Sequence, residues 1–92
     1  MDDLYTRSGL LLQLVGDRLH SRSGRYLGRV VDKKVFDPGG LYCGTLVGDR
    51  VVYRTVDSAA KSTPSEGEAV PASTRANARG VPLWGVEPPF AL

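Results

Sequence analysis

The strongest constraint on the fold is an internal repeat in the first two thirds of the 92-residue chain. Three units begin at Leu4, Leu19 and Val35, and a fourth begins at Val51, so the period is 15 or 16 residues. Each unit opens with apolar or large residues, continues into a polar turn that ends in glycine, and then carries a longer, more apolar stretch. Such a repeat indicates one structural unit that is used several times.

The turns of the first three units, at 6–9, 21–24 and 37–40, predict that each unit is a β-hairpin. They open with Thr6, Ser21 and Asp37, whose side chains can bond to the backbone ahead, and the closing glycine accepts a left-handed conformation. A type I turn followed by such a glycine is a common hairpin connection. A single hairpin is marginally stable in water, so we expect several to pack into an all-β fold.

Alternation along the longer strand of each unit separates two faces. We assign one face to the core, and it carries Leu11, Gln13, Val15, Tyr26, Gly28, Val30, Tyr42, Gly44 and Leu46. The other face is mixed, with Leu10, Leu12, Leu14, Arg25, Leu27, Arg29, Leu41, Cys43 and Thr45. It is too apolar in units one and three to be left wet on a small monomer, which favours an interface.

The repeated pattern of apolar pair, turn, glycine and a strand with aromatic-x-Gly-x-aliphatic resembles the 4-fold beta flower family of small bacterial proteins over residues 4–54. The resemblance implies four hairpins of about 16 residues around a pseudo-fourfold axis, and no assigned activity. A weaker resemblance to PRC-barrel domains covers 27–32 with 36–38.

The fourth unit departs from the pattern after Arg54, where the turn glycine is missing. We divide the chain into residues 1–56, with the repeats, a flexible loop or linker at 57–80, and an apolar strand or docking tail at 81–92. In one interpretation, Leu83 to Val86 is the displaced second strand of unit four, with 83–85 matching 26–28, and it closes the assembly. In the other, Pro82 to Leu92 docks as an extended tail, either on this chain or on another subunit.

Composition excludes several classes of protein. The longest apolar run is too short to span a membrane, and the first residues lack the features of a signal peptide, so we expect a cytoplasmic protein with no membrane partner. One cysteine and one histidine cannot build a disulfide or a Cys/His zinc site. We therefore predict no cofactor and no metal.

No arrangement of residues in the sequence predicts catalysis. His20 lies in the same repeat position as Tyr5 and Phe36, which favours a packing role over a general base. Cys43 lies in the position of hydrophobic residues and has no base near it in sequence. We expect that the protein is not an enzyme.

The leading hypothesis is an interaction or assembly module that forms a homo-oligomer, either a dimer or a closed ring, through its second sheet face. The predicted interface residues are Leu10, Leu12, Leu14, Leu27, Cys43 and Trp84. The alternative is a weak binder of anions or single-stranded nucleic acid, since Arg22, Arg25 and Arg29 follow one another in a tyrosine-containing stretch. A net charge of +2 is too small to favour nucleic acid by itself.

Overall fold

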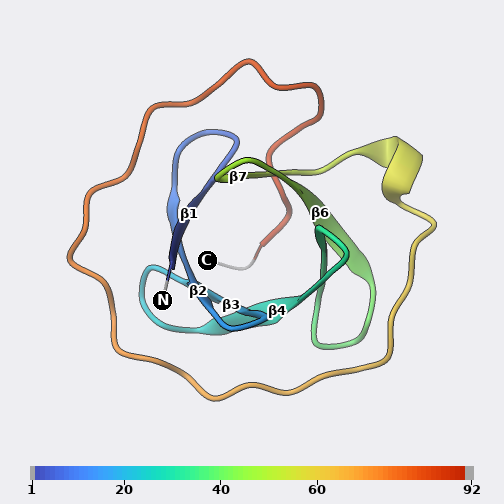
Figure 1. Cartoon of the computed structure of the whole chain (residues 1–92), viewed down its shortest axis with the longest axis horizontal. Helices are drawn as coiled ribbons and strands as arrows, with labels where there is room; N and C mark the ends of the chain where they lie inside the picture. The colour runs from blue at the N-terminus through green and yellow to red at the C-terminus, as the bar shows by residue number, and fades with distance from the viewer. Residues whose placement is uncertain (1, 91–92) are drawn as a thin grey trace.

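The computed structural model describes residues 2–90 and is all-β (Figure 1). Its strands form one closed barrel and follow each other around it in chain order. The strands are β1 (Asp2–Thr6), β2 (Leu11–Val15), β3 (Arg18–Ser21), β4 (Tyr26–Val31), β5 (Lys34–Phe36), β6 (Tyr42–Val47) and β7 (Arg50–Val52), and a short 3-10 helix, η1 (Thr55–Asp57), follows them. No helix among the described residues is long and apolar enough to cross a membrane.

The barrel closes without a fourth long strand. Each strand pairs antiparallel with the next, while β7 pairs with β1 in parallel through Tyr5 with Arg50 and Thr6 with Val51. The 83–86 segment is therefore not needed to close the sheet, and the prediction that it closes the assembly is wrong. The edges of β1 and β7 pair with each other instead.

Side-chain capping of the three predicted turns is confirmed. In each turn the side-chain oxygen of the first residue accepts a hydrogen bond from the backbone amide four residues later. The bonds run from Leu10 to Thr6 Oγ1 at 3.1 Å, from Arg25 to Ser21 Oγ at 3.1 Å, and from Leu41 to Asp37 Oδ1 at 2.9 Å.

The core contains part of the face that the sequence pattern assigned to an interface. Every strand contributes one residue to the buried core cluster, which consists of Leu4, Leu12, Leu19, Leu27, Val35, Cys43 and Val51. The predicted assignment of the two faces is therefore wrong for Leu12, Leu27 and Cys43. In β4 and β6, Leu27 and Cys43 are the extra residues of β-bulges, so the alternation changes phase there and Val30 and Leu46 also pack against the core.

The other face of the barrel is also buried, which is why alternation alone could not identify the core. Leu11, Gln13 and Tyr42 are each less than a tenth exposed. Gln13 donates from Nε2 to the carbonyl of Pro71 at 3.1 Å, and the Tyr26 hydroxyl lies 2.6 Å from Ser65 Oγ. Residues from far along the chain thus cover this face.

The cover is an extended segment at 58–84, which we call the strap. It leaves the barrel after η1, circles it from the outside, and returns before the chain turns inward (Figure 1). It includes most of the stretch that was predicted to be a flexible loop or linker. After the strap, Pro88 is buried and Phe90 packs against the core cluster.

Candidate functional site

The strap binds the three regular turns in the same way each time. Its backbone amides donate to the carbonyls of the three turn glycines, from Ser62 to Gly40, from Val70 to Gly24 and from Ala78 to Gly9, each at 2.8 Å. The donors are eight residues apart, so the extended strap passes from one hairpin turn to the next every eight residues.

A second set of amides has the same spacing and extends to the start of unit four. The strap amides of Ser65, Ser73 and Val81 donate to the carbonyls of Pro38, Arg22 and Arg7, the second residue of each turn, at 2.8 to 3.0 Å. Asp57 of η1 continues the spacing, but it donates locally, to the Arg54 carbonyl three residues before it, at 3.0 Å. Because both partners are backbone groups, the contact requires no particular side chain, and for this reason no sequence motif predicted it.

The glycines of these turns are required by the strap as well as by the turn. Gly9, Gly24 and Gly40 have φ of +101°, +95° and +87° and are buried. A Cβ atom on any of them would overlap the carbonyl oxygen of the strap residue that crosses it. A substitution there must therefore displace the strap in addition to straining the backbone.

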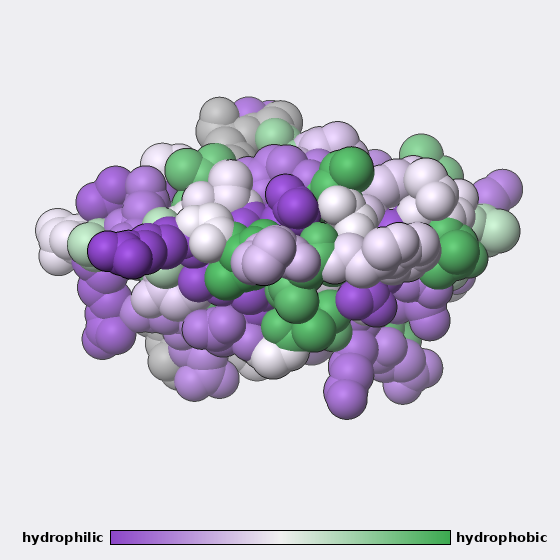
Figure 2. Space-filling view, turned by 90° about the horizontal axis from the view of Figure 1, so that it is seen from above, coloured by the Kyte–Doolittle hydropathy of each residue, from purple (hydrophilic) through white to green (hydrophobic). Residues whose placement is uncertain are grey.

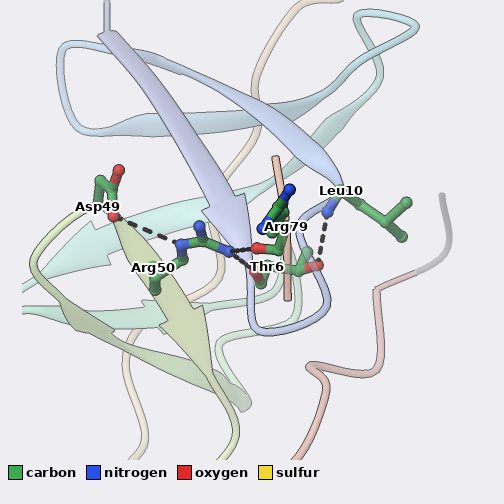
Figure 3. A network of polar contacts seen from close by, with 5 residues as sticks. All are labelled: Thr6, Leu10, Asp49, Arg50 and Arg79. Atoms are coloured by element: carbon green, nitrogen blue, oxygen red, sulfur yellow. Dashed lines mark hydrogen bonds and ion pairs between the residues drawn. The ribbon is translucent and has the colours of Figure 1, made fainter. Parts of the chain in front are cut away.

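An arginine from the barrel also holds the strap at the first turn (Figure 3). The Arg50 guanidinium donates to the carbonyl of Arg79 in the strap and to the carbonyl of Thr6 at 3.5 Å. It is 3.5 Å from Asp49 and lies 5.4 Å from the centre of the Tyr5 ring. The side chain thus connects β7, the first turn and the strap.

The start of unit four meets the end of the strap in a different backbone pattern. In the three turns the amide of the glycine donates to the carbonyl of the first turn residue, at 2.8 to 3.0 Å, whereas the amide of Gly85 makes no such bond to Tyr53. Tyr53 and Val86 exchange backbone hydrogen bonds of 2.8 and 2.9 Å, in the position where Thr6 and Leu10 meet in unit one. Gly85 has φ of +124°. The segment 83–86 forms only the isolated Tyr53–Val86 bridge and no strand, so the prediction that it is the second long strand of unit four is wrong. Gly85 is only half-buried, and its carbonyl has no hydrogen-bond partner within residues 2–90.

An exposed tryptophan stands beside this open glycine. Trp84 is 59% exposed, and the Arg54 guanidinium lies 5.4 Å from the centre of its ring. Arg54 also donates from Nε to the Trp84 carbonyl at 3.2 Å, and no carboxylate of the described residues pairs with it. Together these contacts hold the indole and the cation next to each other on the surface.

These groups surround a hollow of about 300 Å³ that is lined by Tyr53, Arg54, Thr55, Trp84, Gly85 and Val86, and we call this the fourth-turn surface. Val86 is 58% exposed. Figure 2 looks onto the edge of the molecule that is at the top of Figure 1, and there hydrophobic residues gather near the middle between hydrophilic ones. Trp, Tyr and Arg are the residues most often found at the energetic centres of interfaces.

Glu87 anchors the chain next to this surface by binding the first turn. Its carboxylate accepts from Thr6 Oγ1 and from the Ser8 amide, each at 2.8 Å, and from the Ser8 hydroxyl. Burial alone would raise the pKa of Glu87, but the hydrogen bonds from Ser8 and Thr6 and the charge of Arg7 lower it overall. The ionised form is therefore the one that the folded chain favours.

We predict that a Glu87→Gln variant loses up to about 1 kcal/mol of unfolding free energy at neutral pH, since the site is partly solvated. Because the folded pKa is lowered, the contribution of Glu87 is present above the unfolded value of 4.5 and is lost as the pH falls through the folded value. Urea unfolding of both proteins at pH 7 and at pH 3 should show a difference that shrinks in acid. A difference that is the same at both pH values would contradict this assignment.

The predicted interface residues are separated in the structure. Leu12, Leu27 and Cys43 are in the core, and Leu14 is half-buried against it. Leu10 is 39% exposed at the end of the first turn, and Trp84 is exposed at the fourth. Of the six residues, only these two present a large surface to solvent.

The three predicted anion-binding arginines do not share one site. Arg22 lines a hollow of about 660 Å³ between the second turn and the strap. Arg25 lines a different hollow, of about 240 Å³, near Phe90. Arg29 donates to the hydroxyls of Ser62 and Thr63 in the strap, at 3.0 and 3.2 Å.

The residues considered for catalysis serve packing contacts. His20 is buried, with Nε2 2.9 Å from the Glu68 carbonyl, so Nε2 donates there, and its ring meets Tyr26 edge-on. Burial, followed by the charge of Asp37, raises the pKa of the Cys43 thiol to about 11, which keeps it protonated at neutral pH. Within residues 2–90 no group of three or more His, Cys, Asp or Glu side chains is placed to hold a metal ion.

Sequence reasoning missed two features of the fourth-turn surface, the Gly85 carbonyl and Arg54. The sequence does show a local spacing within two of the turns, where one residue separates Arg7 from Gly9 and Arg22 from Gly24. Arg54 and Gly85 are separated by the strap, so this local spacing does not link them. No protein-family model, curated protein or solved structure matches this chain, so its candidate site is defined by geometry alone.

Proposed function

We propose that the protein is a non-enzymatic, cytoplasmic interaction and assembly module that self-associates through the fourth-turn surface. The observation that carries the proposal is the exposed Trp84 with Arg54 held across its ring, beside Val86 and an open hollow. Removing an indole and its apolar neighbours from water supplies the driving force for association. The paired Arg54 cation adds directional specificity.

This proposal moves the interface away from the second sheet face. Leu12, Leu27 and Cys43 pack against each other inside the barrel and offer nothing to a partner. Leu10 and Trp84 keep their predicted role, with Trp84 at the centre because it belongs to the hollow.

We also propose that the barrel and its tail form four related units about a pseudo-fourfold axis, as in the 4-fold beta flower family. The support is the positive φ that Gly85 shares with Gly9, Gly24 and Gly40, together with the Tyr53–Val86 bridge in the position of the other turn closures. In this arrangement the strap is a long insertion within the fourth turn.

A Trp84→Ala variant should associate at least about tenfold more weakly than the wild-type chain, which corresponds to a loss of about 1.4 kcal/mol or more. Sedimentation equilibrium over a wide range of concentrations measures this difference. Leu41→Ala is the matched control, since Leu41 is 56% exposed and lies outside the fourth-turn surface. A wild-type chain that stays monomeric, or equal losses in the two variants, would overturn the proposal.

The alternative function is binding of an anion or single-stranded nucleic acid. Arg29 is committed to the strap hydroxyls, and Arg22 and Arg25 border separate hollows. A titration with a single-stranded oligonucleotide at low salt tests it, and salt-dependent binding that Arg22→Gln reduces would support it.

A further inference from the structure

We propose that the second turn, at 21–24, binds the carboxylate of a small organic acid whose apolar body lies in the hollow between this turn and the strap. The inference goes beyond self-association at the fourth-turn surface, and it gives the alternative function of anion binding one site and one class of ligand. The hollow shares no residue with the fourth-turn surface.

The first step of the argument is that the chain already binds a carboxylate at the first turn, at 6–9. The Glu87 carboxylate accepts hydrogen bonds from Thr6 Oγ1 and from the Ser8 amide, each at 2.8 Å, and from the Ser8 hydroxyl. These donors belong to the first and third residues of the turn, and Arg7 is between them. One turn thus supplies two hydroxyls and a backbone amide to a carboxylate, and such charge-assisted bonds are stronger than bonds between neutral groups.

The second step is that the second turn repeats the first in sequence and in backbone hydrogen bonds. The first turn reads Thr-Arg-Ser-Gly, and the second reads Ser-Arg-Ser-Gly. In both turns the glycine amide donates to the carbonyl of the first residue, at 2.9 and 3.0 Å, and the glycine has φ of +101° and +95°. The strap crosses both turns with the same two bonds, one to the glycine and one to the arginine carbonyl. The second turn therefore presents the same donors on the same backbone.

The third step is that the donors of the second turn bind no carboxylate of the chain. Within residues 2–90 the Ser23 amide has no hydrogen-bond acceptor, and the hydroxyls of Ser21 and Ser23 lie 2.8 Å apart and bond to each other. At the first turn the hydroxyls of Thr6 and Ser8, which both donate to Glu87, lie 3.2 Å apart. Both Ser21 and Ser23 line the hollow of about 660 Å³, so a ligand in it can reach these donors.

A single side chain accounts for the difference between the two turns. Glu87 follows the residue that pairs with Tyr53 at the start of unit four, and Leu11 follows the residue that pairs with Thr6 in unit one. Glu87 reaches the turn of the next unit with its carboxylate, whereas Leu11 lines the hollow and has no polar end. The Gln13 amide donates to two carbonyls of the second turn, at 3.1 and 3.3 Å, and so leaves the hydroxyls to a ligand.

The lining of the hollow defines the class of ligand. Two hydroxyls, one amide and the charge of Arg22 suit a single carboxylate. The apolar part of the lining includes Leu11 and Ala72, and a volume of about 660 Å³ is typical of sites for small molecules. The ligand is therefore a small monocarboxylic acid with an apolar body.

Titration of the full-length chain with benzoate tests the proposal. We expect saturable binding of one benzoate per chain by isothermal titration calorimetry at pH 7. In the two-dimensional NMR spectrum of backbone amides, the largest shift on binding should be that of Ser23. Benzamide has the same shape without the charge, so it is the matched control ligand and should bind at least about tenfold more weakly.

Four variants locate the site. Arg22→Gln and Ser23→Ala should each weaken benzoate binding by about fivefold, whereas Arg7→Gln, at the turn that Glu87 already occupies, should leave it unchanged. Leu11→Glu should abolish binding, because the new carboxylate occupies the second turn as Glu87 occupies the first. Ser23 is exposed, so Ser23→Ala decides the matter if Leu11→Glu does not fold.

The outcomes separate this inference from the functions proposed above. The absence of saturable benzoate binding, equal binding of benzoate and benzamide, or equal losses in Arg22→Gln and Arg7→Gln would overturn it, even if the chain self-associates through Trp84 or binds an oligonucleotide. Losses confined to Arg22→Gln and Ser23→Ala, with the largest NMR shift at Ser23, would establish it, whatever the oligomeric state.

Discussion

Gly24→Ala is expected to reduce the free energy of unfolding by about 3 kcal/mol and to release the strap from the second turn. A side chain at a positive φ costs about 1–2 kcal/mol, and φ at Gly24 is +95°. The added Cβ would also overlap the Val70 carbonyl, so the strap must move and lose its local backbone bonds, at about 1 kcal/mol each.

Gly48→Ala is the matched control for this prediction. Gly48 also has a positive φ, of +61°, but nothing lies within 4 Å of a Cβ at this position. Its loss should be limited to the backbone cost of about 1–2 kcal/mol. Urea unfolding measures both losses, and limited proteolysis should cut the strap faster only in Gly24→Ala. Equal losses of unfolding free energy and equal cleavage rates in the two variants would mean that the strap does not pack against this turn.

Leu12→Ala should cost about 2–5 kcal/mol, because it opens a cavity in a core to which each strand contributes one side chain. Leu12 is fully buried between Leu4 and its other neighbours in the cluster. A barrel of this size has little stability to spare, so the variant is expected to unfold at a much lower urea concentration.

Leu10→Ala, two residues away on the same face of the sequence pattern, should cost less than about 1 kcal/mol. Leu10 is 39% exposed, so truncation leaves no closed cavity. The comparison of Leu10→Ala with Leu12→Ala tests which of the two leucines lies in the core, since the sequence pattern placed both in one interface. A larger loss for Leu10→Ala than for Leu12→Ala would contradict the observed core.

Much of the local structure was predictable because hairpin turns depend on neighbouring residues. Thr6, Ser21 and Asp37 cap their turns as their chemistry predicted, and the glycines that follow adopt positive φ. The repeat also located the strands, since the same turn chemistry returns every 15 or 16 residues.

The candidate site was predictable only in part. Trp84 was among the predicted interface residues, and its side chain is exposed. Its partner Arg54 is 30 residues earlier in the chain and was not connected to it, because only the path of the strap brings the two together. The open Gly85 carbonyl has no side-chain signature at all.

The sequence by itself determined the unit of this protein, a glycine-closed hairpin, because a turn is encoded by four or five consecutive residues. Which face of the strands lies inside was decided by tertiary structure, since the strap buries the second face and bulges at Leu27 and Cys43 change the alternation. The closure of β7 onto β1 and the docking of the strap were decided at that level too. Both consist of bonds between backbone groups far apart in the chain, and backbone groups are the same in every residue except proline.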